Sequence, residues 1–255
     1  MTLRGVPVLQ YDGRGASLPA DVDDRLASHS VTPGRQLGSI PTSTASSRRA
    51  AHDEGALAVI IGLAGGTGSG KSSIVRGLVA RIGGCVIDLE SYALDGSSAD
   101  DEPEAIDTTL LVTQLGELRR GEAIRKPVYS LETHTRTGVE VVAPARLVLV
   151  EGLFTLWWES LRSLLDVKVF VSAPADLRLI RRIRRDLAER GCTVEQVLHQ
   201  YSGPVRTAHE RYVEPTRAHA DDVVINDGPL EDTVEQVIAL VRRRRVDALA
   251  GAVHP

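Results

Sequence analysis

The sequence predicts an α/β fold built on a doubly wound parallel sheet, and two observations lead to that prediction. From residue 56 onward, apolar runs of strand length alternate with helical segments, as expected when helices cover both faces of a parallel sheet. The first apolar run leads into the glycine-rich stretch "GGTGSGKSS" at 65–73, which an amphipathic segment follows. A chain of 255 residues accommodates one principal domain of this kind.

The predicted elements follow from local composition and periodicity. Each strand is a short apolar run, and the predicted strands cover 58–63, 84–88, 146–150, 167–171 and 222–225. Each helix has apolar residues at helical spacing, and the predicted helices cover 71–82, 107–120, 157–164, 174–190, 193–200, 204–218 and 229–246. This alternation is typical of parallel strands joined by crossover helices.

The ends of the chain differ in composition from the middle. Residues 1–55 are rich in Ser, Pro, Gly, Ala and charge and have no sustained apolar period, which predicts a disordered N-terminal extension. Within it, "VPVLQY" at 6–11 either docks as a strand or frays with the rest. The folded domain is predicted to span 56–246, followed by a tail at 247–255.

Composition excludes several classes of function. A net charge of -4 and a pI near 6.0 lack the basic footprint of a protein that mainly binds nucleic acid. The two cysteines, Cys85 and Cys192, lie far apart without neighbours at metal-ligand spacing, so a disulfide scaffold or a zinc site is not expected. No stretch approaches the length of a membrane span, and the sequence predicts a cytoplasmic protein.

The stretch at 65–73 satisfies G-x-x-x-x-G-K-[ST] between a strand and a helix, which is the context that a phosphate-binding loop requires. Its backbone N–H groups and the start of the following helix are suited to surround phosphate groups. Lys71 is predicted to reach the β and γ phosphates, and the Ser72 hydroxyl to ligate Mg²⁺. The predicted nucleotide-binding residues are Gly65, Gly66, Thr67, Gly68, Ser69, Gly70, Lys71, Ser72 and Ser73.

The loop alone does not distinguish the classes of P-loop protein, so the rest of the chain must decide. A GTPase is expected to carry N-K-x-D, and the three lysines, Lys71, Lys126 and Lys168, lie in other contexts. No "LSGGQ"-like signature of the transporter ATPases is present. Phosphoryl transfer to a small acceptor therefore remains. "RLVLVEG" ends a strand with Glu151, which either holds the Mg²⁺ shell through water or is a plain strand-end acid.

Two further segments carry candidate catalytic groups. "CVIDLESY" ends the second predicted strand beside the loop, and either Glu90 or, in reserve, Asp88 could accept a proton from an attacking hydroxyl. In the helix that follows residue 174, Arg178, Arg182 and Arg185 share one face. That face is either a solvated surface or part of an arginine-rich lid at 176–200. "RRRR" at 242–245 ends the last helix and suits its dipole.

The order of several less generic segments identifies a family. The chain resembles the uridine kinase and phosphoribulokinase family, and in particular its uridine-cytidine kinases, over about residues 58–240. The resemblance implies a P-loop kinase fold with a β-hairpin insertion at 122–145, often assembled as a dimer or tetramer. It also implies transfer of the γ-phosphoryl of ATP or GTP, with Mg²⁺, to a nucleoside 5′-hydroxyl. The segments that carry the resemblance are "GLAGGTGSGKSS", "DEPEAID", "RKPVYSLETHTR", "VLVEGLF", "RLIRRIRRDLAERG" and "QYSGPVRTAHERYVEPTRAHADDVVI".

The motif matches assign roles residue by residue. Glu90 stands where the family has its catalytic aspartate, and Asp101 where an aspartate holds the ribose hydroxyls. The remaining matches are nucleoside contacts from the hairpin at Tyr129 and His134, phosphate-side and substrate-side arginines at Arg182, Arg185 and Arg190, and a further substrate contact at Gln200.

Three positions depart from the family pattern. Glu90 adds one methylene to the base, Glu102 stands where the family usually has His, and Cys192 replaces an arginine that contacts the nucleoside. These departures leave two alternatives to a uridine or cytidine kinase. One is a kinase for a sugar, a sugar phosphate or a modified nucleoside of secondary metabolism. The other is a non-catalytic nucleotide-binding regulatory protein.

Overall fold

The computed structural model describes residues 57–97 and 102–251, with side chains up to residue 243. The predicted N-terminal extension at 1–55, including the segment at 6–11, lies outside the described residues. So do the last four residues of the predicted tail at 247–255.

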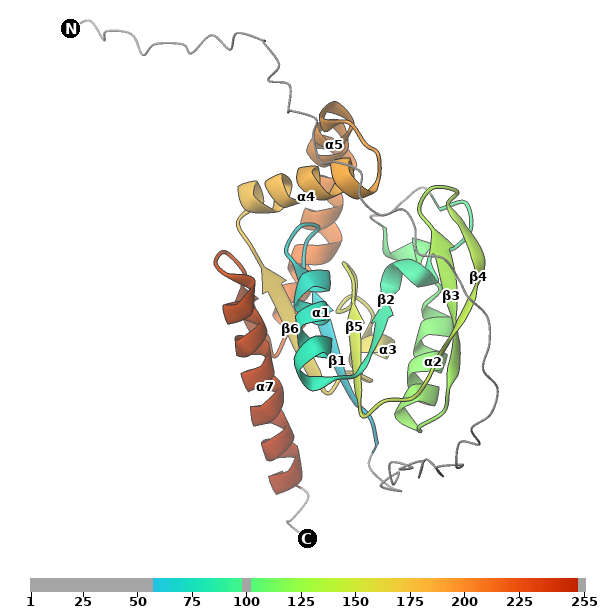
Figure 1. The fold of residues 1–255 in the computed structure, drawn as a ribbon, viewed down its shortest axis with the longest axis vertical. Coiled ribbons are helices and arrows are strands. Elements are labelled where there is room, and N and C mark those ends of the chain that lie inside the picture. Colours follow the sequence, from blue (N-terminus) through green and yellow to red (C-terminus); the bar gives the residue numbers. More distant parts are fainter. Residues whose placement is uncertain (1–56, 98–101, 252–255) are drawn as a thin grey trace, which may run out of the picture. The chain divides into compact units, whose positions relative to one another are not determined.

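The core of the structure is a parallel sheet of five strands in the order β2-β5-β1-β6-β7 (Figure 1). This confirms the predicted fold class, and each strand lies within one residue of its predicted bounds. The three central strands, β5, β1 and β6, are largely buried, because helices cover both faces of the sheet. The strands are β1 (Val59–Ala64), β2 (Cys85–Asp88), β5 (Leu147–Glu151), β6 (Val167–Ser172) and β7 (Asp222–Ile225).

Two hydrophobic clusters hold the helices to the sheet. On one face, apolar side chains of α1 (Lys71–Ile82) and α7 (Leu230–Gly251) pack against the strands, with Leu78 and Val237 fully buried. On the other face, α2 (Thr108–Arg119) and α3 (Glu159–Arg162) supply residues such as Leu115 and Leu161. The last helix runs to Gly251, beyond the 229–246 that the sequence predicts.

The helices α4 (Ala175–Glu189) and α5 (Val194–Gln200) lie over the end of the sheet from which the phosphate loop emerges (Figure 1). The segment predicted as a helix at 204–218 is helical, but it is not one regular α-helix. It consists of the consecutive short helices η3 (Tyr201–Val205, π), α6 (Arg206–Ala208, α), η4 (His209–Val213, π) and η5 (Glu214–His219, 3-10). Pro215 lacks the backbone N–H that a continuing α-helix would use, and it stands at the start of η5.

The insertion forms a separate antiparallel hairpin of β3 (Ile124–Ser130) and β4 (Thr135–Val142), as predicted (Figure 1). The hairpin is fastened to the short 3-10 helix η1 (Leu89–Tyr92). Arg136 donates hydrogen bonds to the carbonyls of Tyr92 at 3.1 Å and Ala93 at 3.0 Å. The hairpin and the segment that carries Glu90 are therefore connected by side chains as well as by packing.

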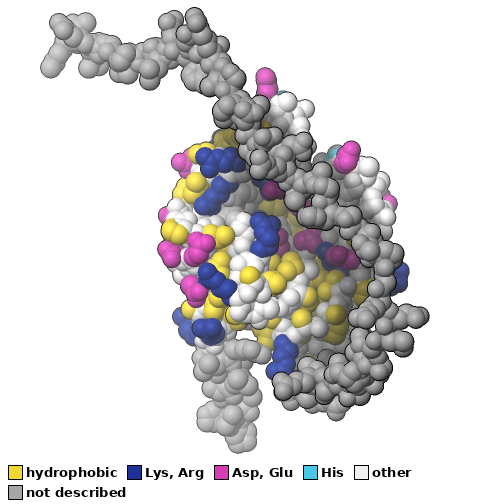
Figure 2. All heavy atoms as spheres, viewed as in Figure 1, with side chains coloured by type: hydrophobic (Ala, Val, Ile, Leu, Met, Phe, Trp, Pro, Cys, Tyr) yellow, Lys and Arg dark blue, Asp and Glu magenta, His cyan; other side chains and the backbone are white. Residues whose placement is uncertain are grey.

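The surface agrees with the near-balanced charge. Basic and acidic side chains are interspersed over the face shown in Figure 2. In the part of the chain that the structure describes, no helix combines the length and apolarity needed to cross a membrane.

Candidate active site

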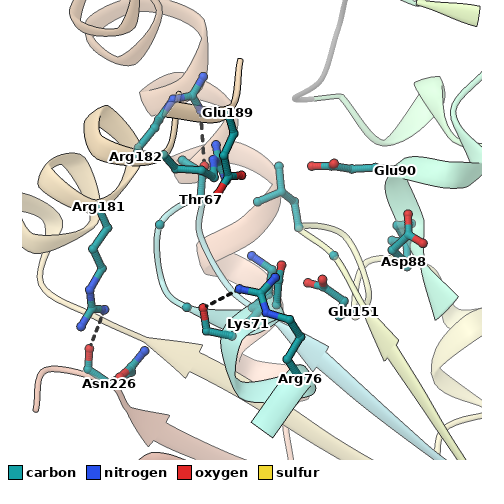
Figure 3. A pocket seen from close by; sticks show the side chains of 18 of the residues that line it. Thr67, Lys71, Arg76, Asp88, Glu90, Glu151, Arg181, Arg182, Glu189 and Asn226 are labelled. Atoms are coloured by element: carbon teal, nitrogen blue, oxygen red, sulfur yellow. Dashed lines mark hydrogen bonds between the residues drawn. The ribbon is translucent and has the colours of Figure 1, made fainter. Parts of the chain in front are cut away.

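A cleft of about 670 Å³ opens where the carboxyl ends of β1, β2 and β5 meet α4. Its walls are the phosphate loop, η1, the segment after β5 and the arginine-rich face of α4 (Figure 3). Parallel strands place their carboxyl ends at one edge, which is why groups distant in sequence share this cleft. Its volume is within the range of small-molecule sites.

Glycine is required where the loop at 65–72 turns most tightly. Gly68 and Gly70 have φ of +73° and +98°, in the left-handed region that favours glycine. A Cβ at Gly68 would run into the carbonyl of Arg178, and one at Gly70 into the amide of Asn226. That amide donates a hydrogen bond to the Ser69 carbonyl at 2.8 Å, so the loop is pinned from β7.

Lys71 begins α1 and turns its ammonium group back into the loop. Its Nζ donates to the carbonyls of Gly65 at 2.8 Å and Gly66 at 3.1 Å. Burial lowers the pKa of Lys71 to about 8, although the charges of Glu151 and Glu90 act in the opposite direction. The side chain is therefore still mainly cationic at neutral pH and directed at the space that the loop encloses.

Ser72 and Glu151 form the part of the cleft that suits a magnesium ion. Both side chains line the cleft beside Lys71. Burial raises the pKa of Glu151, against the opposing effects of Lys71 and Ser72. Among residues 57–97 and 102–243, no group of three or more His, Cys, Asp or Glu side chains could hold a metal. A hydroxyl and one acid still fit Mg²⁺, because in such sites nucleotide phosphates and water complete its shell.

The two candidate bases have different surroundings. Asp88 accepts hydrogen bonds from Lys126 Nζ at 2.6 Å and from the Ser91 hydroxyl at 2.7 Å. Burial alone would raise the pKa of Asp88, but these partners outweigh it and the pKa is lowered. The Glu90 side chain is 65% exposed, its nearest ion-pair contact is Arg190 at 3.7 Å, and it extends into the cleft (Figure 3). Glu90 is the freer of the two acids.

Three predicted arginines line the cleft, and one that shares their helix does not. Arg182, Arg185 and Arg190 face the cleft from α4 and its C-terminal end. Arg182 is buried and directs Nη1 toward the Thr67 hydroxyl at 3.4 Å (Figure 3). Arg178 instead packs behind the loop, where its Nη2 lies 3.3 Å from His209 Nε2.

The cleft brings together most, but not all, of the predicted site residues. Of the predicted loop residues, three do not line the cleft: Gly65, Gly66 and Ser69. Asp101 lies outside the described residues. Gln200 lies behind Arg182 and accepts a hydrogen bond from its Nη2 at 3.1 Å.

The hairpin reaches the cleft through Leu131, between the predicted contacts Tyr129 and His134. The Tyr129 hydroxyl approaches the Ser97 carbonyl at 3.4 Å. The backbone of His134 has a left-handed φ of 52°. In the structure, neither of these two side chains lines the cleft.

Sequence reasoning missed several residues of the site, among them Asn226 and Arg181. Arg181 lines the cleft and donates to the Asn226 carbonyl at 2.9 Å (Figure 3). The available signal for Asn226 was its place directly after the predicted strand 222–225, at the sheet edge where ligands bind. No sequence signal distinguished Arg181 from the other arginines of the same helix.

Comparison with known proteins decides the family. The sequence profile of the Phosphoribulokinase / Uridine kinase family matches residues 90–234, more than half of the chain. The chain belongs to this family. Its members include the uridine kinase of Geobacillus sp. (strain WCH70), which is 38% identical over 197 residues, 72% of this chain and 93% of that protein. The uridine kinase of Staphylococcus epidermidis is 39% identical over 183 residues, 66% of this chain and 88% of its own length.

Solved structures agree on the fold of this family member. A kinase from Silicibacter sp. TM1040, assigned to a fructose transport system, superposes with a TM-score of 0.58 at 21% identity. The match covers 67% of this chain and 91% of that one. The P-loop kinase fold and the family resemblance that the sequence predicts are thus both confirmed.

Proposed function

We propose that this protein transfers the γ-phosphoryl group of ATP, or GTP, to the 5′-hydroxyl of a uridine- or cytidine-like nucleoside and releases the 5′-monophosphate. The observation that carries the proposal is the largely exposed carboxylate of Glu90, which lies 3.7 Å from Arg190 and faces the same cleft as Lys71, Ser72 and Glu151. Phosphoryl transfer needs such an arrangement, with a base for the hydroxyl on one side and cations around the phosphates on the other. The curated uridine kinases at 38% and 39% identity support the same reaction.

The donor side of the reaction follows from the charges. Lys71, Arg182, Arg185 and Arg190 bring positive charge to the oxygens of the transferring phosphoryl group, where negative charge must be stabilised. Mg²⁺, held by Ser72 and by Glu151 through water, would bridge the phosphate oxygens and neutralise part of their charge. The arginines on α4 also cover the cleft and limit the access of water.

The acceptor side depends on Glu90. Its carboxylate accepts the proton of the attacking 5′-hydroxyl, a role for which Asp88 is less suited because Lys126 and Ser91 already occupy its oxygens. The Leu131 side chain contributes an apolar wall for the acceptor. We further propose that Asp101, Tyr129, His134 and Gln200 orient the nucleoside, as the family motifs imply, with the hairpin moving toward the cleft on binding.

A second acceptor class is favoured by one specific observation. Cys192 stands where the family has an arginine, and its thiol lies near the Arg190 carbonyl, with Sγ 3.9 Å from that oxygen, rather than in the cleft. At this position the protein therefore lacks the guanidinium hydrogen-bond donors that an arginine would offer to a nucleoside. A sugar, a sugar phosphate or a modified nucleoside is the alternative acceptor. Assembly as a homo-oligomer and a cytoplasmic location remain predictions.

An acceptor panel tests the proposal. ADP release is measured with Mg–ATP and, in turn, uridine, cytidine, other nucleosides, ribose and sugar phosphates, with Lys71→Met as the inactive control. Release that depends on uridine or cytidine supports the proposal, and release with another acceptor alone supports the second class. ATP binding without acceptor-dependent ADP release would support the alternative of a non-catalytic, nucleotide-binding regulatory protein. Repeating the assay with GTP decides the donor.

A further inference from the structure

We propose that Asp186 is a positioning residue for phosphoryl transfer: its single carboxylate holds three of the arginines that line the cleft, Arg182, Arg185 and Arg190, in the arrangement that the reaction needs. The inference rests on the proposed function, because the arginines matter to catalysis only if a phosphoryl group is transferred in the cleft. Asp186 itself does not line the cleft and would touch neither substrate. It acts through the side chains that do.

The contacts converge on one acid. Arg185 places its Nε and Nη2 each 2.8 Å from Asp186 Oδ1. Arg190 approaches the same oxygen with Nε at 3.6 Å, and Arg182 places Nε 3.1 Å from Oδ2. The spacing explains two of the contacts, because Arg182 and Arg190 stand four positions before and after Asp186 on its face of the helix. Arg185 directly precedes Asp186 and reaches it from the neighbouring position. The backbone N–H of Cys192 also donates to the Asp186 carbonyl at 3.1 Å and turns the chain after α4 back toward the acid.

Burial makes this carboxylate decisive. The Asp186 side chain is only 1% exposed, so water contributes little to its solvation and the guanidinium groups must provide it. The three arginines carry like charges and lie close together, between the middle and the C-terminal end of α4. Without the carboxylate they would repel one another and turn toward solvent, away from the phosphates.

The same acid links the two halves of the proposed reaction. Arg190 lies 3.7 Å from Glu90, on the acceptor side. Arg182 reaches Thr67 of the phosphate loop at 3.4 Å, on the donor side. Asp186 contacts both arginines, so its position determines how far apart the base and the phosphate-binding groups are held. Small displacements of this kind are costly in phosphoryl transfer, which depends mainly on positioning.

A double-mutant cycle tests the inference on the full-length protein. Asp186→Asn is made in the wild-type and Arg185→Gln backgrounds, and kcat, KM for Mg–ATP and the melting temperature are measured for each. Asp176→Asn is the matched control, because it makes the same chemical change on an exposed face of the same helix. We expect Asp186→Asn to lower kcat at least about tenfold with KM changed less than about threefold. The control stays within about twofold of wild type.

The cycle distinguishes positioning from general stability. If Asp186 acts through the arginines, Asp186→Asn lowers kcat by less than about threefold in the Arg185→Gln background. An equal loss in both backgrounds, or none in either, overturns the inference. If Asp186→Asn does not fold, the same cycle with Asp186→Glu decides, because the added methylene moves the carboxylate but keeps its charge. A coupled loss supports the inference, and an additive loss or none overturns it.

Failure of the proposed function has a different signature. If the wild-type protein turns over no acceptor, the reaction assignment fails, and the role of Asp186 is then measured by binding of Mg–inorganic triphosphate. We expect Asp186→Asn to weaken this binding at least about fivefold in the wild-type background and by less than about twofold beside Arg185→Gln. Equal weakening in both backgrounds, or unchanged affinity, overturns the inference.

Discussion

Replacing Lys126 with methionine should reduce both stability and turnover. Lys126 is buried on β3 and binds Asp88 at 2.6 Å, Glu140 at 2.8 Å and the Ser91 hydroxyl at 3.2 Å. Asp88 also accepts the backbone N–H of Ser91 at 2.9 Å and thereby caps η1, the turn that carries Glu90. Lys126 therefore connects the hairpin to the turn that carries Glu90 through one carboxylate.

The size of the effect follows from the exposure of the partners. Removing one member of a fully buried ion pair costs about 3–5 kcal/mol. Asp88 is 34% exposed and Glu140 more so, which lets water solvate part of the abandoned charge. We therefore expect the free energy of unfolding to fall by about 2 kcal/mol. For a domain of this size the melting temperature then drops by about 4–8 °C. If η1 shifts as well, kcat falls about tenfold, equivalent to about 1.4 kcal/mol.

The assay is thermal unfolding at neutral pH together with acceptor-dependent ADP release. Lys168→Met is the control, since Lys168 forms a partly exposed pair with Asp221 at 3.2 Å and lies outside the cleft. We expect it to lower stability by less than about 1 kcal/mol without affecting kcat. Because the pKa of Asp88 is lowered by folding, its contribution is present above its unfolded value of 3.8 and is lost as the pH falls through the folded value. The difference between Lys126→Met and wild type should therefore narrow below about pH 4. Equal melting temperatures for Lys126→Met and Lys168→Met, with unchanged kcat, would refute the reasoning.

Three further outcomes test the site. Glu90→Gln should lower kcat at least about a hundredfold with little change in KM for ATP, and Asp88→Asn should lower it less; the reverse order in steady-state kinetics would make Asp88 the base. Gly70→Ala should weaken Mg–ATP binding at least about tenfold by calorimetry, because alanine disfavours φ of +98° and its Cβ meets the Asn226 amide. Burial and the charge of Arg178 lower the pKa of His209 from 6.5 to about 4, so the unfolded chain binds the extra proton between these values. The free energy of unfolding should then fall by about 3 kcal/mol from pH 6.5 to 4, and His209→Gln, in denaturant titrations, should flatten that slope.

Much of this protein could be predicted from local sequence alone. The strands appear as runs of apolar residues, the phosphate loop as a spacing of glycines with one lysine and one serine, and both signals lie within short windows. Apolar composition and residue spacing are local properties, so the five strands of the parallel sheet and the loop could be placed to within a residue. The helix predicted at 204–218 is divided into short π, α and 3-10 helices, because Pro215 removes a backbone donor that the apolar spacing does not report.

The choice between Glu90 and Asp88 depended on tertiary structure. Asp88 ends β2 and Glu90 follows two residues later in η1, and only the fold brings Lys126, 38 residues from Asp88, into contact with Asp88. Asn226 likewise reaches the loop across 157 residues to bind Ser69. Such contacts join segments that the parallel crossovers bring to one sheet edge, and no local pattern encodes which side chain meets which. The sequence by itself therefore determined the chemistry that the chain can offer, and the packing of distant segments decided which groups are left free to perform it.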